Sequence, residues 1–228
     1  MANISEAYGK IFVKADSKKA LEELKKVIKW HDDLSKRGDY FTEITSEGGL
    51  DKARIFEFFD SPYCGFEVNF SGYGRWSYHT NVEAFLNWPY YDEENHDIDF
   101  DLLKKSNFSL TFIFRDEECG NDFLYEAELV LDHKKGVEID NTKCIEEKYK
   151  GYKRTWVNLL KFGYSLKGLI ELYLYDQENF DLYETLEREK ASLEEYLDKP
   201  LKEIIGEKYY NAYLKGEKEY KKREEENS

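Results

Sequence analysis

The chain has 228 residues, of which 41% are hydrophobic, 36% are charged and 17% are aromatic. This composition is typical of a folded, soluble protein and excludes a globally disordered chain, because disordered chains are poor in aromatic residues. The formal net charge of −14 repels nucleic-acid phosphates and anionic membrane surfaces, so we expect neither as a direct partner.

Cysteine usage and hydropathy indicate a cytoplasmic protein. Cys64, Cys119 and Cys144 are too few and too widely spaced for a disulfide framework or a zinc site. The first residues lack the basic region and apolar run of a signal peptide, and no stretch approaches the ~20 apolar residues of a membrane span. We therefore expect a reducing cytoplasm and no membrane segment.

The first half of the chain predicts strands and helices in alternation. Gly9–Lys14 is a predicted strand, and Asp16 or Ser17 offers an N-cap for a helix that ends near Trp30. A second helix is predicted from Asn81 to Trp88, where Pro89 stops it. Three β-like runs lie between the two helices: Asp39–Thr45, Ala53–Phe59 and Gly65–Phe70.

This order predicts an α+β fold close to a ferredoxin-like sandwich with an extra strand. The runs Ser109–Phe114 and Phe123–Leu131 alternate well and form a predicted hairpin, and Val137–Asp140 is a candidate third strand. We therefore expect residues 1–150 to form one domain, with an antiparallel or mixed sheet and helices on one face.

The pattern becomes helical after residue 150. Trp156–Phe162 and Leu166–Tyr175 are dense in Leu and Tyr. Asp181–Leu197 and Pro200–Leu214 carry apolar residues at helical spacing, and only Asp198 and Lys199 connect them. A connection this short predicts antiparallel packing of the two helices. We expect residues 151–228 to form a helical region that packs on the first domain.

A glycine-flanked aromatic segment is the first candidate recognition site. Gly72 and Gly74 flank Tyr73 at a predicted strand-to-helix junction, where glycine permits a positive φ or a close backbone approach. Aromatic and arginine side chains are typical anchors of binding surfaces. The candidates for partner binding here are Tyr73, Arg75, Trp76 and Tyr78. In the structural alternative, Trp76 is buried between sheet and helix, and Arg75 pairs with an acid such as Glu83.

Two acidic runs are further candidates for partner binding. The first contains Asp92, Glu93, Glu94, Asp97 and Asp99. Its spacing is not that of a calcium-binding EF-hand, because Leu102 stands where the loop needs glycine and Phe108 where it needs glutamate. The run is either a solvated loop or a face that imitates the phosphates of a nucleic acid.

The second acidic run is Asp116, Glu117 and Glu118. These carboxylates lie at the predicted hairpin loop, which favours an exposed position. Carboxylates in such a place can also hold a metal or act as an acid and base. The histidines His31, His79, His96 and His133 are dispersed, and no catalytic or nucleotide-binding motif occurs. We therefore assign no catalytic residue, metal or cofactor.

Several segments together resemble the YubB/Api92-like ferredoxin-fold proteins of phages and plasmids. They are Phe70–Trp76 with Asn81, Leu110–Phe114 and Asp116–Phe123. In that family, a Trp-bearing loop and a later acidic hairpin lie on one small α+β domain. The resemblance covers roughly residues 8–140, and of the family's Thr-x-Trp-x-Pro-Pro segment only Trp88-Pro89 is present. It implies a mobile-element setting and no particular chemistry.

Two functions follow as hypotheses. The first is a non-enzymatic, phage- or plasmid-type protein that binds and inhibits a host protein with a basic, nucleic-acid-binding face, in the host cytoplasm. It follows from an acidic, aromatic-rich chain without a catalytic motif. The alternative is a metal-dependent hydrolase with a site built from Asp116, Glu118 and the loop 92–101.

Overall fold

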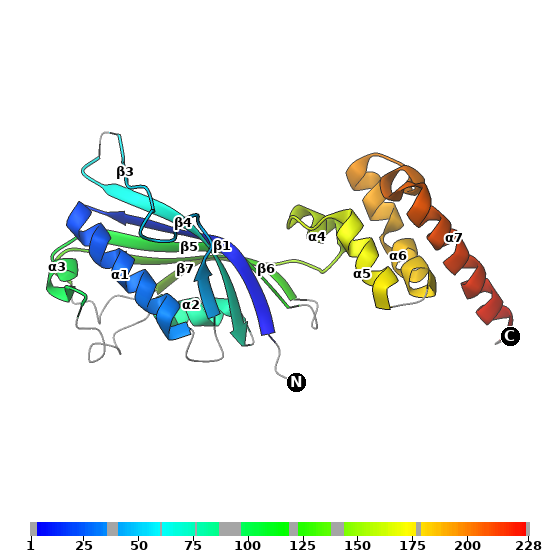
Figure 1. The fold of residues 1–228 in the computed structure, drawn as a ribbon, viewed down its shortest axis with the longest axis horizontal. Helices are drawn as coiled ribbons and strands as arrows, with labels where there is room; N and C mark the ends of the chain where they lie inside the picture. Colours follow the sequence, from blue (N-terminus) through cyan, green and yellow to red (C-terminus); the bar gives the residue numbers. More distant parts are fainter. Residues whose placement is uncertain are drawn as a thin grey trace. The chain divides into compact units, whose positions relative to one another are not determined.

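The computed structural model of the chain describes residues 4–35, 41–59, 61–75, 77–86, 97–118, 123–137, 144–176 and 179–226. The chain divides into two compact units, residues 1–152 and residues 153–228. The first unit combines a β-sheet with helices, and the second is helical (Figure 1). The predicted α+β class with a helical C-terminal part is therefore confirmed.

Ten helices and strands of the first unit lie in the described residues. In chain order they are β1 (Ile4–Ala15), α1 (Lys18–Ser35), β2 (Phe41–Ile44), β3 (Phe56–Glu57), β4 (Cys64–Arg75), α2 (Tyr78–Leu86), α3 (Phe100–Lys104), β5 (Phe108–Glu118), β6 (Phe123–His133) and β7 (Cys144–Gly151). The predicted elements recur here with shifted ends. The candidate strand Val137–Asp140 lies mostly outside the described residues, and sequence analysis missed β7.

The described strands form one antiparallel sheet in the order β2-β4-β1-β5-β6-β7, with β3 paired to the first residues of β4. The antiparallel sheet is as predicted, while its finer ferredoxin-like topology is not confirmed. β2, the strand that follows α1, runs parallel to β1 with β4 between them, because β4 pairs antiparallel with both. β6 and β7 extend the sheet beyond β5, so the strand order of the whole sheet differs from that of a four-stranded ferredoxin-like fold.

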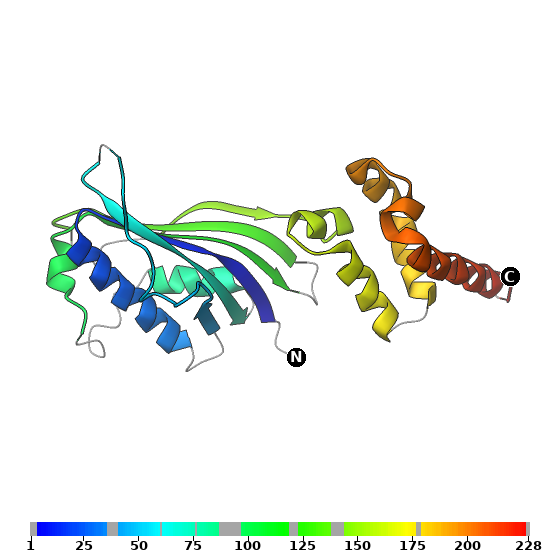
Figure 2. The same ribbon diagram turned by 45° about the horizontal axis from the view of Figure 1, so that its top comes forward.

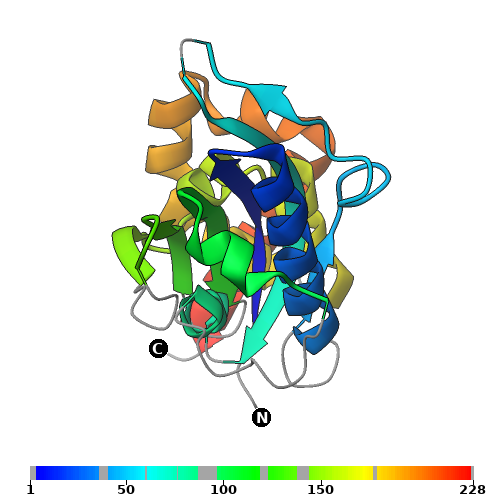
Figure 3. The same cartoon turned by 90° about the vertical axis from the view of Figure 1, so that its left-hand side faces the viewer.

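Helices α1 and α2 lie on the same side of the sheet, as predicted (Figure 2). The covered face carries Ala7, Ile11 and Val13 of β1, together with alternate residues of β4, β5 and β6. Helix α1 contributes Ala20, Leu21, Leu24, Val27 and Ile28, which are at most 1% exposed. Figure 3 views this unit from the end at which α3 lies. The hydrophobic core therefore fills the space between the helices and this one face.

The glycines of β4 allow α2 to approach the covered face closely. A Cβ on Gly72 would lie 2.3 Å from Cε2 of Tyr78, and one on Gly74 would lie 2.6 Å from the Cα of Tyr78. Neither glycine has a positive φ, and both lie inside a continuous strand. These two glycines therefore serve a close backbone approach and not a positive φ.

The second unit contains α4 (Trp156–Lys161), α5 (Leu166–Asp176), α6 (Asn179–Leu197) and α7 (Leu201–Glu226). Tyr183, near the start of α6, contacts Tyr213 at the middle of α7 and Tyr220 in its C-terminal half, with ring centroids 5.3 and 5.5 Å apart. The predicted antiparallel packing is therefore confirmed. Helix α7 is kinked at Gly206, whose φ is 76°.

Candidate functional site

The sheet of the first unit has a face that α1 and α2 do not cover, which we call the open face. It carries the residues of β1 that alternate with the core positions: Ile4, Glu6, Tyr8, Lys10, Phe12 and Lys14. Four large apolar or aromatic residues on this face are more than a third exposed: Ile4 (56%), Tyr8 (51%), Ile113 (43%) and Tyr73 (39%). Several neighbouring residues of this kind typically mark a binding surface.

The strand register places these residues side by side. Glu6 of β1 lies opposite Tyr73 of β4, so Tyr73 stands between Ile4 and Tyr8 across the strand pair. Lys10 lies opposite Ile113 of β5, one row beyond Tyr8. Cross-strand neighbours on one face are within side-chain contact distance. The four exposed residues therefore belong to one continuous surface and are not scattered.

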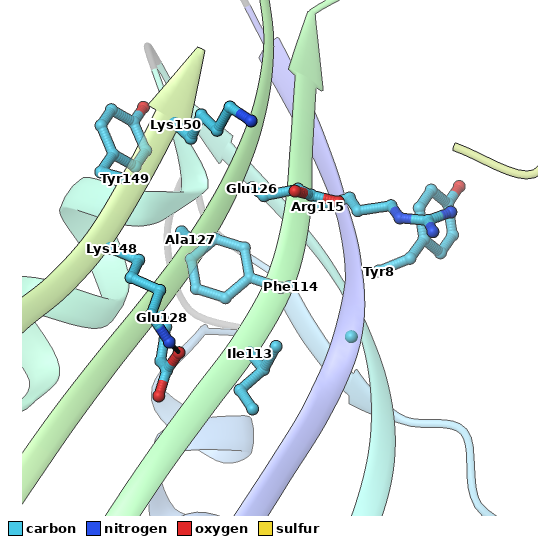
Figure 4. A pocket seen from close by; sticks show the side chains of 11 residues that line it. Tyr8, Ile113, Phe114, Arg115, Glu126, Ala127, Glu128, Lys148, Tyr149 and Lys150 are labelled. Carbon is cyan, nitrogen blue, oxygen red and sulfur yellow. Dashed lines mark hydrogen bonds and ion pairs between the residues drawn. The ribbon is translucent and has the colours of Figure 1, made fainter. Parts of the chain in front are cut away.

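A groove of about 670 Å³ lies at this surface across β1, β5, β6 and β7 (Figure 4). Its lining residues are Tyr8, Gly9, Ile113, Phe114, Arg115, Glu126, Ala127, Glu128, Lys148, Tyr149 and Lys150. Its volume falls within the range of ligand pockets in proteins. Tyr8 and Ile113 supply exposed apolar surface within it, and charged side chains of β6 and β7 surround them.

Several charged side chains of the open face pair with one another. Lys148 pairs with Glu128 at 2.9 Å, as Figure 4 shows, and Lys10 pairs with Glu67 at 3.4 Å. Glu126 accepts a hydrogen bond of 2.6 Å from the Tyr152 hydroxyl. Because Lys10 and Lys148 face carboxylates, part of the positive charge of this surface is already balanced, whereas phosphate binding needs unbalanced positive charge. The arrangement favours contact with another protein.

Tyr8 remains a neutral phenol in this surface. Partial burial, followed by the neighbouring Glu6 carboxylate, raises the pKa of Tyr8 to about 12. Its hydroxyl donates a hydrogen bond of 3.1 Å to Glu6. Tyr8 therefore presents an uncharged ring with a polar end, which suits a protein contact.

Tyr73 and Tyr78, two of the residues predicted at the glycine-flanked segment, do not lie together. Tyr73 projects from the open face, whereas Tyr78 is fully buried on the covered face. The Tyr78 hydroxyl lies 2.7 Å from Oγ1 of Thr42, which in turn lies 3.3 Å from Nε2 of His31. Tyr78 is thus a core residue and not an exposed contact. The side chain of Arg75 and all of Trp76 lie outside the described residues.

The second acidic run is buried, which corrects the expectation of an exposed hairpin. The exposed fractions of Asp116, Glu117 and Glu118 are 0%, 5% and 6%. The physical reason is that β5 continues to Glu118, so that these residues belong to the sheet and not to a loop. Burial raises the pKa of Asp116 to about 6, against the effect of hydrogen bonds from His79, Ser5 and Tyr78.

The first acidic run is only partly described. Asp92, Glu93 and Glu94 lie outside the described residues, while Asp97 and Asp99 are exposed. Asp99 is the N-cap of α3, because its carboxylate accepts a hydrogen bond of 2.9 Å from the Leu102 N–H. Within the described part of the chain, no three His, Cys, Asp or Glu side chains converge as metal ligands. The hydrolase alternative stays a prediction.

Sequence analysis missed the open-face residues Tyr8, Ile113, Lys148 and Lys150. The signal was present in β1, where Ala7, Ile11 and Val13 alternate with Tyr8 and Lys10. That alternation indicates one buried and one exposed face, but it does not reveal that α1 and α2 both lie on the same face.

Comparisons with known proteins leave the site to be interpreted from its own geometry. No protein-family model, no curated protein and no solved structure matches the chain. Among the described helices, none has both the length and the apolar character needed to cross a membrane.

Proposed function

We propose that the chain is a protein-binding protein that docks a partner on the open face of its first unit. The observation that carries this proposal is the uncovered sheet face, with Ile4, Tyr8, Tyr73 and Ile113 exposed in one continuous surface. Exposed aromatic residues beside a groove are the usual anchors of protein interfaces. The pairing of several surrounding charges favours a protein over a nucleic acid.

The partner is a protein with a basic surface. The first unit contains 20 Lys and Arg against 31 Asp and Glu, a formal net charge of −11. This field attracts a basic protein at long range, while the exposed aromatic and apolar residues of the open face make the contact. A protein that itself binds nucleic acid has such a surface. The resemblance to phage and plasmid proteins adds that the partner is a host protein, which the complex inhibits.

Affinity capture followed by measurement on a purified partner tests the proposal. The immobilised wild-type chain and a Tyr8→Ala/Ile113→Ala variant are exposed to the same lysate at low and raised salt. A protein retained only by the wild type is identified, purified and titrated by calorimetry. We expect the double variant to weaken binding at least about 30-fold, since the loss of even one interface anchor costs about 2 kcal/mol or more.

The double variant must remain folded for this comparison, and we expect a nearly unchanged melting temperature because both side chains are largely exposed. The matched control is Tyr196→Ala, which removes an aromatic ring that is 45% exposed on α6 of the second unit. Equal binding by the wild type and the double variant, or no weakening of binding at raised salt, would overturn the proposal.

A further inference from the structure

An aromatic hairpin rises from the far end of the open face. It joins β3 to β4, and Figure 2 shows it on the side of the sheet opposite to α1 and α2. Phe56 and Phe58 lie over Gly65, since a Cβ there would be 3.3 and 3.2 Å from their rings. Phe59, in the turn, is 95% exposed. A large apolar side chain so fully in water has no stabilising role in its own chain.

Hydrogen bonds and ring contacts of the described residues support the hairpin next to Phe59. The N–H of Phe58 donates to the carbonyl of Tyr63 at 3.2 Å, and the N–H of Ser61 donates to the carbonyl of Phe58 at 3.3 Å. The ammonium of Lys14 lies 5.2 Å from the Phe58 ring centroid and 4.4 Å from that of Tyr63. Phe59 is therefore presented on a preorganised support, which lowers the entropy lost on binding.

The charges around the hairpin do not select a charged partner. Lys18 and Glu57 pair at 2.8 Å, and Lys14 lies against the aromatic rings. The net charge of −14 also disfavours insertion into an anionic membrane. What fits Phe59 is an uncharged, apolar recess in a protein surface.

The groove at the other end of the same face offers apolar surface of this kind at Tyr8 and Ile113. Phe58 and Tyr63 contact Lys14, whereas the groove begins at Tyr8. Six residues of one strand span roughly 20 Å, so Phe59 cannot reach the groove of its own chain. Phe12 lies between the two on β1. A two-fold axis that lies between two facing open faces, parallel to the sheets and near Phe12, exchanges the hairpin of one copy with the groove of the other.

We infer that two copies of the chain associate through their open faces, each placing Phe59 into the groove beside Tyr8 and Ile113 of the other. The contact is reciprocal and therefore closed, as in most homodimers. The local ion pairs Lys10–Glu67 and Lys148–Glu128 remove charge from the contact itself. This inference concerns the purified chain alone and stands whether or not a partner of the proposed kind exists.

Salt separates this association from partner binding. Two copies of charge −14 repel each other at long range, and salt screens that repulsion. Raised salt therefore strengthens the self-association, whereas it weakens binding of a basic partner. Since both contacts use the open face, self-association and partner binding compete.

Sedimentation velocity on the purified full-length chain tests the inference, over a wide range of concentration at low and raised salt. We expect a monomer–dimer equilibrium that Phe59→Ala and Ile113→Asp each weaken at least about 30-fold, while Tyr196→Ala does not change it. Ile113→Ala serves as a milder groove variant if the aspartate perturbs folding. Because the contact is reciprocal, a mixture of Phe59→Ala and Ile113→Asp should form a heterodimer with one intact contact, tighter than either homodimer.

Three results would overturn the inference. A wild-type chain that remains monomeric at the highest concentration and salt excludes the dimer. If the wild type dimerises but the hairpin variant and the groove variant do not both weaken the dimer, the contact between Phe59 and the groove is excluded. Phe59-dependent sedimentation with anionic lipid vesicles, in a chain that does not self-associate, assigns the hairpin to a membrane surface instead.

Discussion

The carboxylate of Asp116 accepts a hydrogen bond of 3.0 Å from the backbone N–H of His79. Asp116 belongs to β5 and His79 to the first turn of α2, so a strand supplies the acceptor for the N-terminus of a helix that precedes it in the chain. The negative charge also lies favourably at the positive end of the helix dipole. Burial opposes this charge and raises the pKa of Asp116 to about 6.

Asp116 should make the protein more stable as the pH falls towards 4. Its native pKa of about 6 exceeds the unfolded value of 3.8, so between these values the native state binds the proton more strongly. The free energy of unfolding should rise by about 2–3 kcal/mol through this group between pH 7 and pH 4. Urea titrations of the wild type and Asp116→Asn check this. Parallel pH profiles of the two proteins would contradict it.

His31 should make the protein less stable as the pH falls. Burial lowers its pKa from 6.5 to about 4, so the unfolded state binds the proton more strongly between these values. Stability should therefore fall by about 3 kcal/mol through His31 as the pH drops from 6.5 to 4. His31→Gln should remove this loss, seen as a higher urea midpoint relative to its own pH 7 value. A variant that loses as much stability on acidification as the wild type refutes this.

Alanine at either glycine under α2 should destabilise the first unit. Gly72→Ala and Gly74→Ala each place a Cβ within 2.6 Å of Tyr78, and we expect a loss of about 1–3 kcal/mol from overpacking. Tyr73→Ala, between them on the open face, is the matched control and should change stability little. Thermal and urea unfolding measure all three. Equal stability of Gly74→Ala and Tyr73→Ala would show that α2 does not lie on the strand.

Leu193 and Leu197 offer a matched pair on α6. Leu193 is fully buried and Leu197 is 37% exposed. Leu193→Ala should lower the free energy of unfolding of the second unit by about 2–5 kcal/mol, because it leaves a cavity in the core. Leu197→Ala should lower it by much less. The two variants are compared by calorimetry, and similar losses would mean that Leu193 does not lie in the core.

Local patterns in the sequence predicted the helices and strands better than they predicted which strands pair with one another. The apolar spacing of α1 was sufficient to place its buried face, because Leu21, Leu24 and Ile28 recur at helical steps. The pairing of β4 with β1 was not predictable, since the register depends on contacts between residues about 60 positions apart. A ferredoxin-like order and the observed order share the same succession of strand and helix.

The candidate site was less predictable than the fold. Acidic residues at Asp116–Glu118 resemble a solvated loop in sequence, yet they continue a strand, and their burial follows from tertiary packing. The exposure of Phe59 was missed because Ala53–Phe59 is β-like throughout, although Ser61 and Pro62 indicate a turn immediately after it. Burial of a charge and exposure of an aromatic ring both oppose the average behaviour of these residues.

The contact between Tyr78 and its two glycines also constrains how this protein can diverge. Gly72 meets the ring of Tyr78, whereas Gly74 meets its backbone. In a relative, position 72 should therefore vary together with position 78, with alanine tolerated where the aromatic ring is replaced by a smaller side chain. Position 74 should remain glycine whatever residue occupies position 78, as long as the helix lies on the strand. Two positions in the same short segment would thus show different patterns of substitution for one structural reason.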